Sequence, residues 1–382
     1  MSVQELVNQQ MVTWRHAFHR CPEPGFKELK TAKIVADLLS GFGLTVHQGL
    51  ATTGVVGVLK RGDSGRTIGL RADMDGLPIR EETGLGYRSE KTGFMHACGH
   101  DGHMAMLLGA ARILAERDTF NGTVYFIFQP AEENLGGAKV MVEEGLFKRF
   151  PMDRVFGLHN KPGIKEGHFA TRTGAMMAAF DTFDITLQGK GTHAAMPQNG
   201  VDTVVMAAEV VNAFQTVISR RINPTDPGVV SVTQINGGDT WNVIPEMVKM
   251  AGCTRHFNPE VGGEIRSAMA KILQGICQAH GGTFQWNYQP RYPATINDEK
   301  ASELAMSAAI NVVGVQKVDG QVRPGIASED FSFMLQQVPG NYMFLGSGEA
   351  HAPLHNPHFD FNDALLPIGS QYWIELVETI LA

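Results

Sequence analysis

Apolar residues recur along the first part of the chain in a pattern that predicts alternating strands and helices. Short apolar runs predict buried strands at residues 55–60, 67–71, 123–128 and 154–158. Helical spacing of apolar residues predicts helices at residues 12–42 with a break at 22–25, at 103–116 and at 137–146. This alternation is typical of an α/β domain that has a mostly parallel sheet with helices on both faces.

The middle of the chain follows another order. Strands are predicted at residues 181–187, 229–234, 247–252 and 283–289, and helices at 202–220 and 263–280. This β-α-β-β-α-β order is the ferredoxin-like α+β arrangement. A helix at 299–313, a strand at 342–346 and a helix from residue 364 then resume the first pattern. We therefore predict a discontinuous α/β domain at residues 1–178 and 292–382, with an inserted α+β domain at 179–291; the first would be the catalytic, metal-binding domain and the second a satellite and dimerisation domain if the candidate residues and the resemblance described below hold.

Composition narrows the class of protein. The chain has 382 residues, of which 43% are hydrophobic and 19% charged, and this suits a globular protein of two domains. The net charge is -7 and no run of Lys or Arg stands out, so nucleic acid is not an expected partner. No apolar run approaches the roughly 18 residues that span a membrane. The four cysteines are widely separated, so we expect the protein in the reducing cytoplasm.

The densest group of metal-capable side chains lies at residues 96–103, just before a predicted helix. Further candidates follow apolar runs: Glu132 with Glu133, His159 and His355. Parallel strands end at one edge of their sheet, and α/β sheets form their sites there. Thiolate, imidazole and carboxylate ligands suit zinc, manganese, cobalt or nickel. Adjacent glutamates allow one carboxylate to bind metal while its neighbour moves protons.

Each candidate also has a purely structural interpretation. Glu132 and Glu133 could form the acidic first turn of a helix, which the helix dipole favours. A single histidine after a strand, such as His159, is more often a core residue than a ligand. Four nearby residues are interpreted as turn, orienting or capping residues outside the site: Asp73, Asp75, Asp101 and His103. The site hypothesis therefore depends on the candidates lying together.

Seven short blocks of sequence strengthen that hypothesis. They are residues 70–75 (LRADMD), 96–103 (HACGHDGH), 129–133 (QPAEE), 157–159 (GLH), 189–197 (GKGTHAAMP), 242–245 (NVIP) and 354–357 (LHNP). In this set and order the chain resembles the co-catalytic metallopeptidase and aminoacylase family, in its amidohydrolase branch. That branch includes hippurate hydrolase, N-acyl-amino-acid amidohydrolases and the plant auxin-conjugate hydrolases. The resemblance covers nearly the whole chain.

The resemblance implies a metal centre with two divalent ions per chain that share a water. The implied metal ligands are Cys98, His100, Glu133, His159 and His355. Glu132 is implied to be the general base.

The resemblance also implies functional residues in the inserted domain. His193 is implied to be catalytic, and in the family this histidine can reach the active site of a dimer mate. Asn242 and Arg255 match positions that resemble substrate contacts. The chain departs from the family at Cys253, where threonine is usual, and this affects the surroundings of Arg255.

Three hypotheses for function remain open. The first is a metal-dependent amidohydrolase that cleaves N-acyl amino acids, of the hippurate type, into a carboxylate and a free amino acid. The second is a dipeptidase or carboxypeptidase on the same fold. The third is a non-catalytic metal-dependent binding protein, against which Glu132 argues because pure binding needs no unligated carboxylate beside a metal. The expected partners are a small-molecule N-acyl amino acid and a second copy of the chain in a homodimer.

Overall fold

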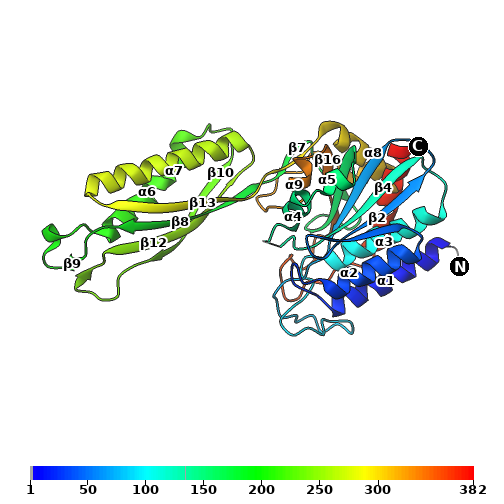
Figure 1. The fold of residues 1–382 in the computed structure, drawn as a ribbon, viewed down its shortest axis with the longest axis horizontal. Helices are drawn as coiled ribbons and strands as arrows, with labels where there is room; N and C mark the ends of the chain where they lie inside the picture. The colour runs from blue at the N-terminus through cyan, green and yellow to red at the C-terminus, as the bar shows by residue number, and fades with distance from the viewer. Residues whose placement is uncertain (1–2, 134) are drawn as a thin grey trace. The chain divides into compact units, whose positions relative to one another are not determined.

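The chain folds into two compact units. The computed structural model describes residues 3–133 and 135–382. Unit 1 comprises Met1–Met176, Ile296–Arg323 and Asp330–Ala382, and unit 2 comprises Met177–Thr295 and Pro324–Glu329. Figure 1 shows the two units, which are described separately below. Among the described residues, no helix combines the length and the apolar character that crossing a membrane requires.

Unit 1 is built on an eight-stranded sheet with parallel strands at its centre. In spatial order the strands are β1 (Thr45–Leu50), β2 (Gly54–Arg61), β4 (Gly122–Gln129), β3 (Thr67–Asp73), β5 (Arg154–Pro162), β16 (Gly340–Gly348), β6 (Phe169–Ala170) and β15 (Val318–Asp319). The four central strands β4, β3, β5 and β16 run parallel, whereas β2 and β6 pair with them antiparallel. The predicted mostly parallel sheet is confirmed. The central strands therefore end at one common edge.

Helices cover both faces of this sheet, as predicted (Figure 1). One face carries the longer helices α2 (Leu29–Gly41), α3 (His100–Glu116), α8 (Glu299–Val313) and α10 (Leu365–Leu381), with α1 (Val3–Arg20) packed over α3. The opposite face carries the shorter helices α4 (Gly137–Glu143), α5 (Leu146–Arg149) and α9 (Ser332–Leu335). Both faces of the four central strands are thus removed from water.

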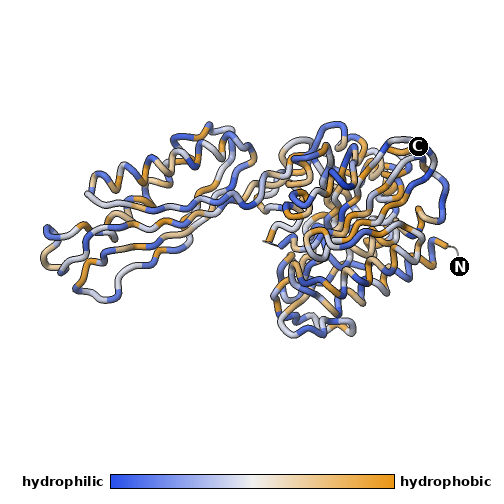
Figure 2. The backbone as a smooth tube through the Cα atoms, in the orientation of Figure 1, coloured by the Kyte–Doolittle hydropathy of each residue, from blue (hydrophilic) through white to orange (hydrophobic). Residues whose placement is uncertain are grey.

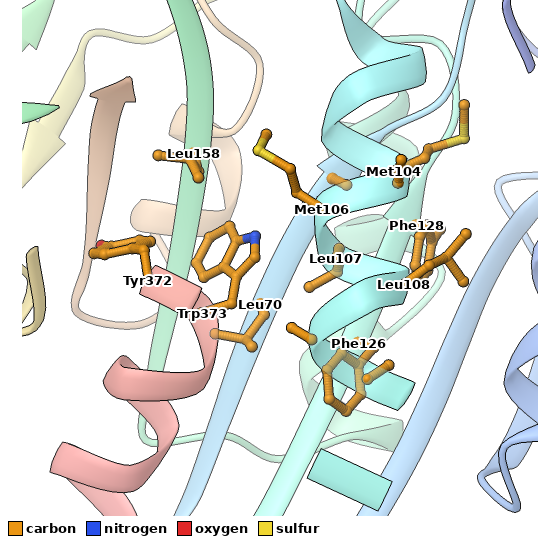
Figure 3. Packing of buried hydrophobic residues seen from close by; sticks show 14 of the residues in the cluster. Leu70, Met104, Met106, Leu107, Leu108, Phe126, Phe128, Leu158, Tyr372 and Trp373 are labelled. Carbon is orange, nitrogen blue, oxygen red and sulfur yellow. The ribbon is translucent and has the colours of Figure 1, made fainter. Parts of the chain in front are cut away.

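The core of unit 1 explains why α3 begins where it does. All eight residues of β4 are buried, and Phe126 and Phe128 pack with side chains from α3 such as Leu107 and Leu108 (Figure 3). Trp373 of α10 fills the space beside them (Figure 3). Hydrophobic residues gather along the strands and inner helices (Figure 2). Because α3 is buried along most of its length, its first turn is fixed at the carboxyl end of the sheet.

Unit 2 has the predicted ferredoxin-like order. Its antiparallel sheet has the spatial order β10 (Gly228–Asn236), β12 (Met247–His256), β8 (Ala179–Gln188) and β13 (Thr283–Tyr292). Helices α6 (Thr203–Arg221) and α7 (Pro259–His280) pack on one face of it (Figure 1). Buried residues recur every fourth position along α7, at Ile265, Met269, Leu273 and Cys277, and this spacing gives the helix one apolar face.

Short elements complete the fold. Strand β9 (Thr192–His193) pairs with β11 (Val243–Ile244), and β7 (Gly174–Met177) pairs with β14 (Thr295–Asn297). Two 3-10 turns, Pro197–Asn199 and Val315–Lys317, lie in the connections.

A buried ionic network fixes α1 to the start of α3. The Arg15 side chain is fully buried, and its Nε donates to Asp101 Oδ2 at 2.9 Å. Nearby, His19 Nδ1 lies 2.8 Å from the same Asp101 oxygen, and His19 Nε2 lies 3.3 Å from Glu81 Oε1. Burial alone would lower the pKa of His19, but its hydrogen bonds to Asp101 and Glu81 outweigh burial and raise the pKa to about 9. His19 is therefore a buried cation at neutral pH.

This charge predicts a pH-dependent stability. A raised pKa means that His19 contributes stability fully below the ordinary histidine pKa of about 6.5 and loses that contribution as pH rises through about 9. We predict that His19→Gln lowers the free energy of unfolding more at pH 6 than at pH 10, by on the order of 3 kcal/mol. Urea unfolding of both proteins at both pH values measures the difference. His358→Gln, at an exposed histidine, is the control, and an equal loss at both pH values for His19→Gln would show that His19 is neutral in the folded state.

Candidate metal centre and active site

The candidate side chains of unit 1 come from the ends of its central strands and from the first turn of α3. Glu132 and Glu133 follow β4, and His355 lies in the loop after β16. Strand β5 is longer than expected and includes His159, because β16 pairs with it beyond residue 158, with Phe344 opposite His159. Helix α3 begins at His100, three residues earlier than expected.

The structure brings the five predicted metal ligands and Glu132 into one cluster. One ligand atom from each of Cys98, Glu133 and His355 lies within 4.8 Å of the other two, and the same holds for His100, Glu132 and Glu133. The Cys98 Sγ atom lies 3.4 Å from His159 Nε2, so His159 joins the same cluster. His355 Nε2 lies 3.0 Å from Glu133 Oε1.

His100 and His159, which are both buried, each direct one ring nitrogen into this cluster. His100 Nδ1 lies 2.9 Å from the carbonyl oxygen of Asp75, so Nδ1 donates there and Nε2 remains as the position for a proton or a metal ion. That Nε2 atom is buried and has no hydrogen-bond partner among the described residues. His159 Nδ1 lies 2.6 Å from the carbonyl oxygen of Asn160, which leaves its Nε2 facing Cys98. An imidazole whose one nitrogen is held by a carbonyl oxygen, while the other faces the cluster, is the usual arrangement of a metal ligand.

The electrostatics of the cluster favour a bound cation. Burial raises the pKa of the Cys98 thiol well above its ordinary value, and the carboxylates of Glu133 and Glu132 raise it further. Burial would lower the pKa of His100, but the carboxylates of Asp73 and Asp75 prevail and raise it to about 10. Thiolate, imidazole and carboxylate donors so close together need positive charge between them. The residues present therefore fit divalent metal ions.

Asp75 orients three of these candidates at once, a role that its sequence position did not reveal. Its two carboxylate oxygens accept hydrogen bonds from the backbone N–H groups of Glu132 and Glu133, each at 3.0 Å. Its carbonyl oxygen holds His100. Behind the same turn, the buried Glu28 accepts a hydrogen bond from the N–H of Ala131 at 2.9 Å. These contacts fix the directions of both glutamates.

A second set of contacts supports Cys98 and His100 from behind. His103 Nδ1 lies 2.6 Å from Asp73 Oδ1, and its Nε2 lies 2.6 Å from Asn160 Oδ1. Gly99, between Cys98 and His100, has φ +92°, and a Cβ atom there would lie 2.3 Å from Asn160 Oδ1. Only glycine fits this position. The glycine was the one signal in the sequence that could have suggested such close packing.

The candidates in unit 2 lie at two places within that unit. His193 of β9 is opposite Val243 of β11, and the carbonyl of the adjacent Asn242 accepts from the N–H of Ala194 at 3.0 Å. His193 and Asn242 are thus brought together. Arg255 lies toward the other end of β12, where its guanidinium carbon is 4.2 Å from the centre of the Phe180 ring. Within unit 2 it also donates through Nη1 to Ser328 Oγ.

The sequence matches a known family over most of its length. The profile of the family described as Peptidase family M20/M25/M40 matches residues 69–379. The chain belongs to this family, and it is a hydrolase of the amidohydrolase type that the sequence blocks indicated. The similarity extends to named relatives and to solved structures.

Two relatives and one solved structure show which members of the family the chain resembles. It is 42% identical to a hippurate hydrolase from Campylobacter jejuni over 362 residues, which cover 95% of this chain and 94% of the relative. It is 37% identical to an N-acetyl-L-cysteine deacetylase from Bacillus subtilis over 378 residues, which cover 98% of this chain and 89% of the relative. Its fold matches the crystal structure of a dinuclear metal-binding peptidase of the M20 family from Bacillus subtilis, with a TM-score of 0.87, 30% identity and 99% coverage of both chains.

The contacts of Asp75 predict a specific defect in metal binding. Asp75→Ala removes the acceptors that hold Glu132 and Glu133. We predict that the variant binds zinc about 10- to 100-fold more weakly than the wild type, since residues that orient ligands have effects of this size. Competition with a coloured chelator measures the affinity. Asp37→Ala, at the exposed Lys33–Asp37 pair on α2, is the control and should bind normally. Unchanged affinity in Asp75→Ala would refute the orienting role.

Proposed function

We propose that the protein hydrolyses the amide bond of N-acyl amino acids, of the hippurate type, through a centre that holds two divalent metal ions. The observation that carries the proposal is the pair Glu132–Glu133 beside Cys98 and the histidines, with both glutamates held by Asp75. The names of the two relatives, hippurate hydrolase and N-acetyl-L-cysteine deacetylase, support this class of substrate.

Two ions are proposed because the donors are too many and too mixed for one tetrahedral ion. We assign Cys98, His100, Glu133, His159 and His355 as ligands. The dinuclear relative of known structure supports the number. Zinc, manganese, cobalt and nickel all suit these donors. When bound, such ions polarise an amide carbonyl and make water more acidic.

Glu132 is assigned as the general base. Its side chain is 7% exposed, which keeps bulk water from competing for the proton. Its backbone N–H is held by Asp75, and its Oε1 accepts from the N–H of Asp330 at 3.4 Å. We propose that Glu132 takes a proton from the attacking water and passes it to the leaving nitrogen.

The residues of unit 2 are proposed to bind the substrate. His193 is exposed on β9 and would stabilise the developing oxyanion, from its own chain or across a dimer. Arg255, with Asn242, would orient the free carboxylate of the amino acid through charge-assisted hydrogen bonds. We further propose that residues 1–178 and 292–382 form the catalytic domain and that 179–291 form the satellite domain. Free thiols at all four cysteines suit the reducing cytoplasm.

A panel of substrates tests the function directly. Protein reconstituted with zinc or manganese should hydrolyse hippurate or N-acetyl amino acids faster than unblocked dipeptides. Faster cleavage of dipeptides or of longer peptides would instead favour the dipeptidase or carboxypeptidase alternative. No turnover of any member, with substrate still bound, would favour the non-catalytic binding protein.

The two glutamates should differ when each loses its charge. We predict that Glu132→Gln keeps two metal ions and lowers kcat by about 100- to 10,000-fold, as removal of a general base does. Glu133→Gln should instead lose metal, because it removes a ligand. Elemental analysis and hippurate kinetics on both variants measure these effects. The reverse pattern would show that the two roles are exchanged.

Arg255 should discriminate between acids and amides. We predict that Arg255→Ala raises KM for hippurate by about 10-fold or more and leaves KM for the matching carboxamide nearly unchanged, because the lost contact is made to the carboxylate. Lys249→Ala, an exposed cation on the same strand, is the control. Equal effects on both substrates would mean that Arg255 makes only structural contacts.

Unit 2 should also mediate a homodimer. It exposes several large apolar side chains, including Trp241 at 95% and Ile235 at 53%, and pairing with a second copy could remove such side chains from water. We predict a dimer at micromolar concentration that buries on the order of 1,600 Å² in total. Ile235→Glu on the edge strand β10 should shift it toward monomer in light scattering. Leu29→Glu, at an exposed leucine of unit 1, should not. A wild-type monomer would contradict the prediction.

A further inference from the structure

Asp330 closes the base of the loop that carries Glu132. Its side chain is fully buried. One oxygen accepts from Gln129 Nε2 at 2.8 Å and from Arg71 Nη2 at 3.1 Å, and the other accepts from Gln129 Nε2 at 2.9 Å and from the N–H of Ala138 at 2.9 Å. Gln129 is the last residue of β4 and Ala138 lies in the first turn of α4. One carboxylate therefore joins the two ends of the loop.

The same residue also contacts the tip of the loop. The backbone N–H of Asp330 donates to Glu132 Oε1 at 3.4 Å. Asp75 holds the backbone of Glu132, whereas Asp330 contacts its carboxylate. The position of Asp330 therefore influences the direction in which the second carboxylate oxygen of Glu132 points.

The segment before Asp330 contacts Arg255, the residue that is proposed to bind the carboxylate of the substrate. Ser328 accepts a hydrogen bond from Arg255 Nη1. The segment Pro324–Glu329 packs with unit 2, and its Gly325 and Ala327 carbonyls both accept from the N–H of Ala178 at 3.1 Å. Only Glu329 separates Ser328 from Asp330 in the chain. Since two residues of extended chain span at most about 7 Å, Ser328 and Asp330 must stay close to each other.

We infer that Asp330 is a positioning residue for Glu132 and that residues 328–330 couple recognition of the substrate's carboxylate at Arg255 to that positioning. The inference rests on the proposed function. A carboxylate bound by Arg255 would fix the guanidinium and, through Ser328, the start of this short segment. Arg71, Gln129 and Ala138 hold the carboxylate of Asp330, so the segment has two fixed ends and transmits the constraint to the loop.

The first test is Asp330→Asn, which keeps the volume but places an amide N–H₂ against the donors of Gln129 and Ala138. We expect two metal ions to remain bound, KM for hippurate to stay within about twofold, and kcat to fall by about 10- to 100-fold, as a small misplacement of a reacting group does. Asp37→Asn on α2 is the control. Loss of metal, or an unchanged kcat, would overturn the positioning role.

The second test concerns coupling and uses Ser328→Ala, a mild change at a partly exposed residue. We expect kcat/KM to fall about 3- to 10-fold for hippurate and to change by less than twofold for its carboxamide. In the Asp330→Asn background, Ser328→Ala should cost less than twofold with hippurate, because the link is already broken. Fully multiplicative losses, or equal losses on acid and amide, would overturn the coupling.

These outcomes are separable from those of the proposed function. If the wild type hydrolyses no N-acyl amino acid, the proposed function fails. If the wild type hydrolyses hippurate and Glu132→Gln does not, while Asp330→Asn retains full kcat, this inference fails and the proposed function stands.

Discussion

Repulsion between closely spaced acidic side chains is the main constraint on the site at the carboxyl edge of the sheet of unit 1. Ligand atoms of Glu132 and of Cys98 each lie within 4.8 Å of one of Glu133, and both Glu132 and Cys98 are buried. Cys98 must also lose its proton to bind a metal ion, which adds a further negative charge. Such an arrangement is unfavourable unless cations neutralise it. Burial raises the pKa of Cys98 and the neighbouring carboxylates raise it further, whereas for His100 the carboxylates outweigh burial and raise the pKa. Bound metal ions would relieve the repulsion, and folding and metal binding should be coupled.

Holding these groups in place also costs backbone strain. Ala131 and His355 both adopt positive φ values, of 54° and 62°, which side chains other than glycine rarely take. Each is fixed by a hydrogen bond from its own N–H, to Glu28 in the first case and to the carbonyl of Ala97, at 2.8 Å, in the second. The surrounding core therefore determines the geometry of the site more than local propensity does.

Much of this arrangement could be predicted from the sequence, because the pattern of apolar runs places strand ends and the candidate ligands follow them. The β-α-β-β-α-β order of unit 2 and the parallel centre of unit 1 are examples. The orienting residues could not be predicted in the same way. Asp75 and Asp330 act through hydrogen bonds to backbone groups 57 and 192 residues away, at Glu132 and Ala138. Such contacts leave no periodic signal, since they arise only when the sheet closes.

We propose that hydrolysis requires two metal ions in the cluster around Glu133. The most direct measurement is a titration of metal-free protein with zinc or manganese, counting bound ions and following hippurate hydrolysis at each step. We predict no activity without metal and an increase in activity that ends near two bound ions per chain. Full activity in metal-free protein, or saturation of both binding and activity at a single ion, would contradict it.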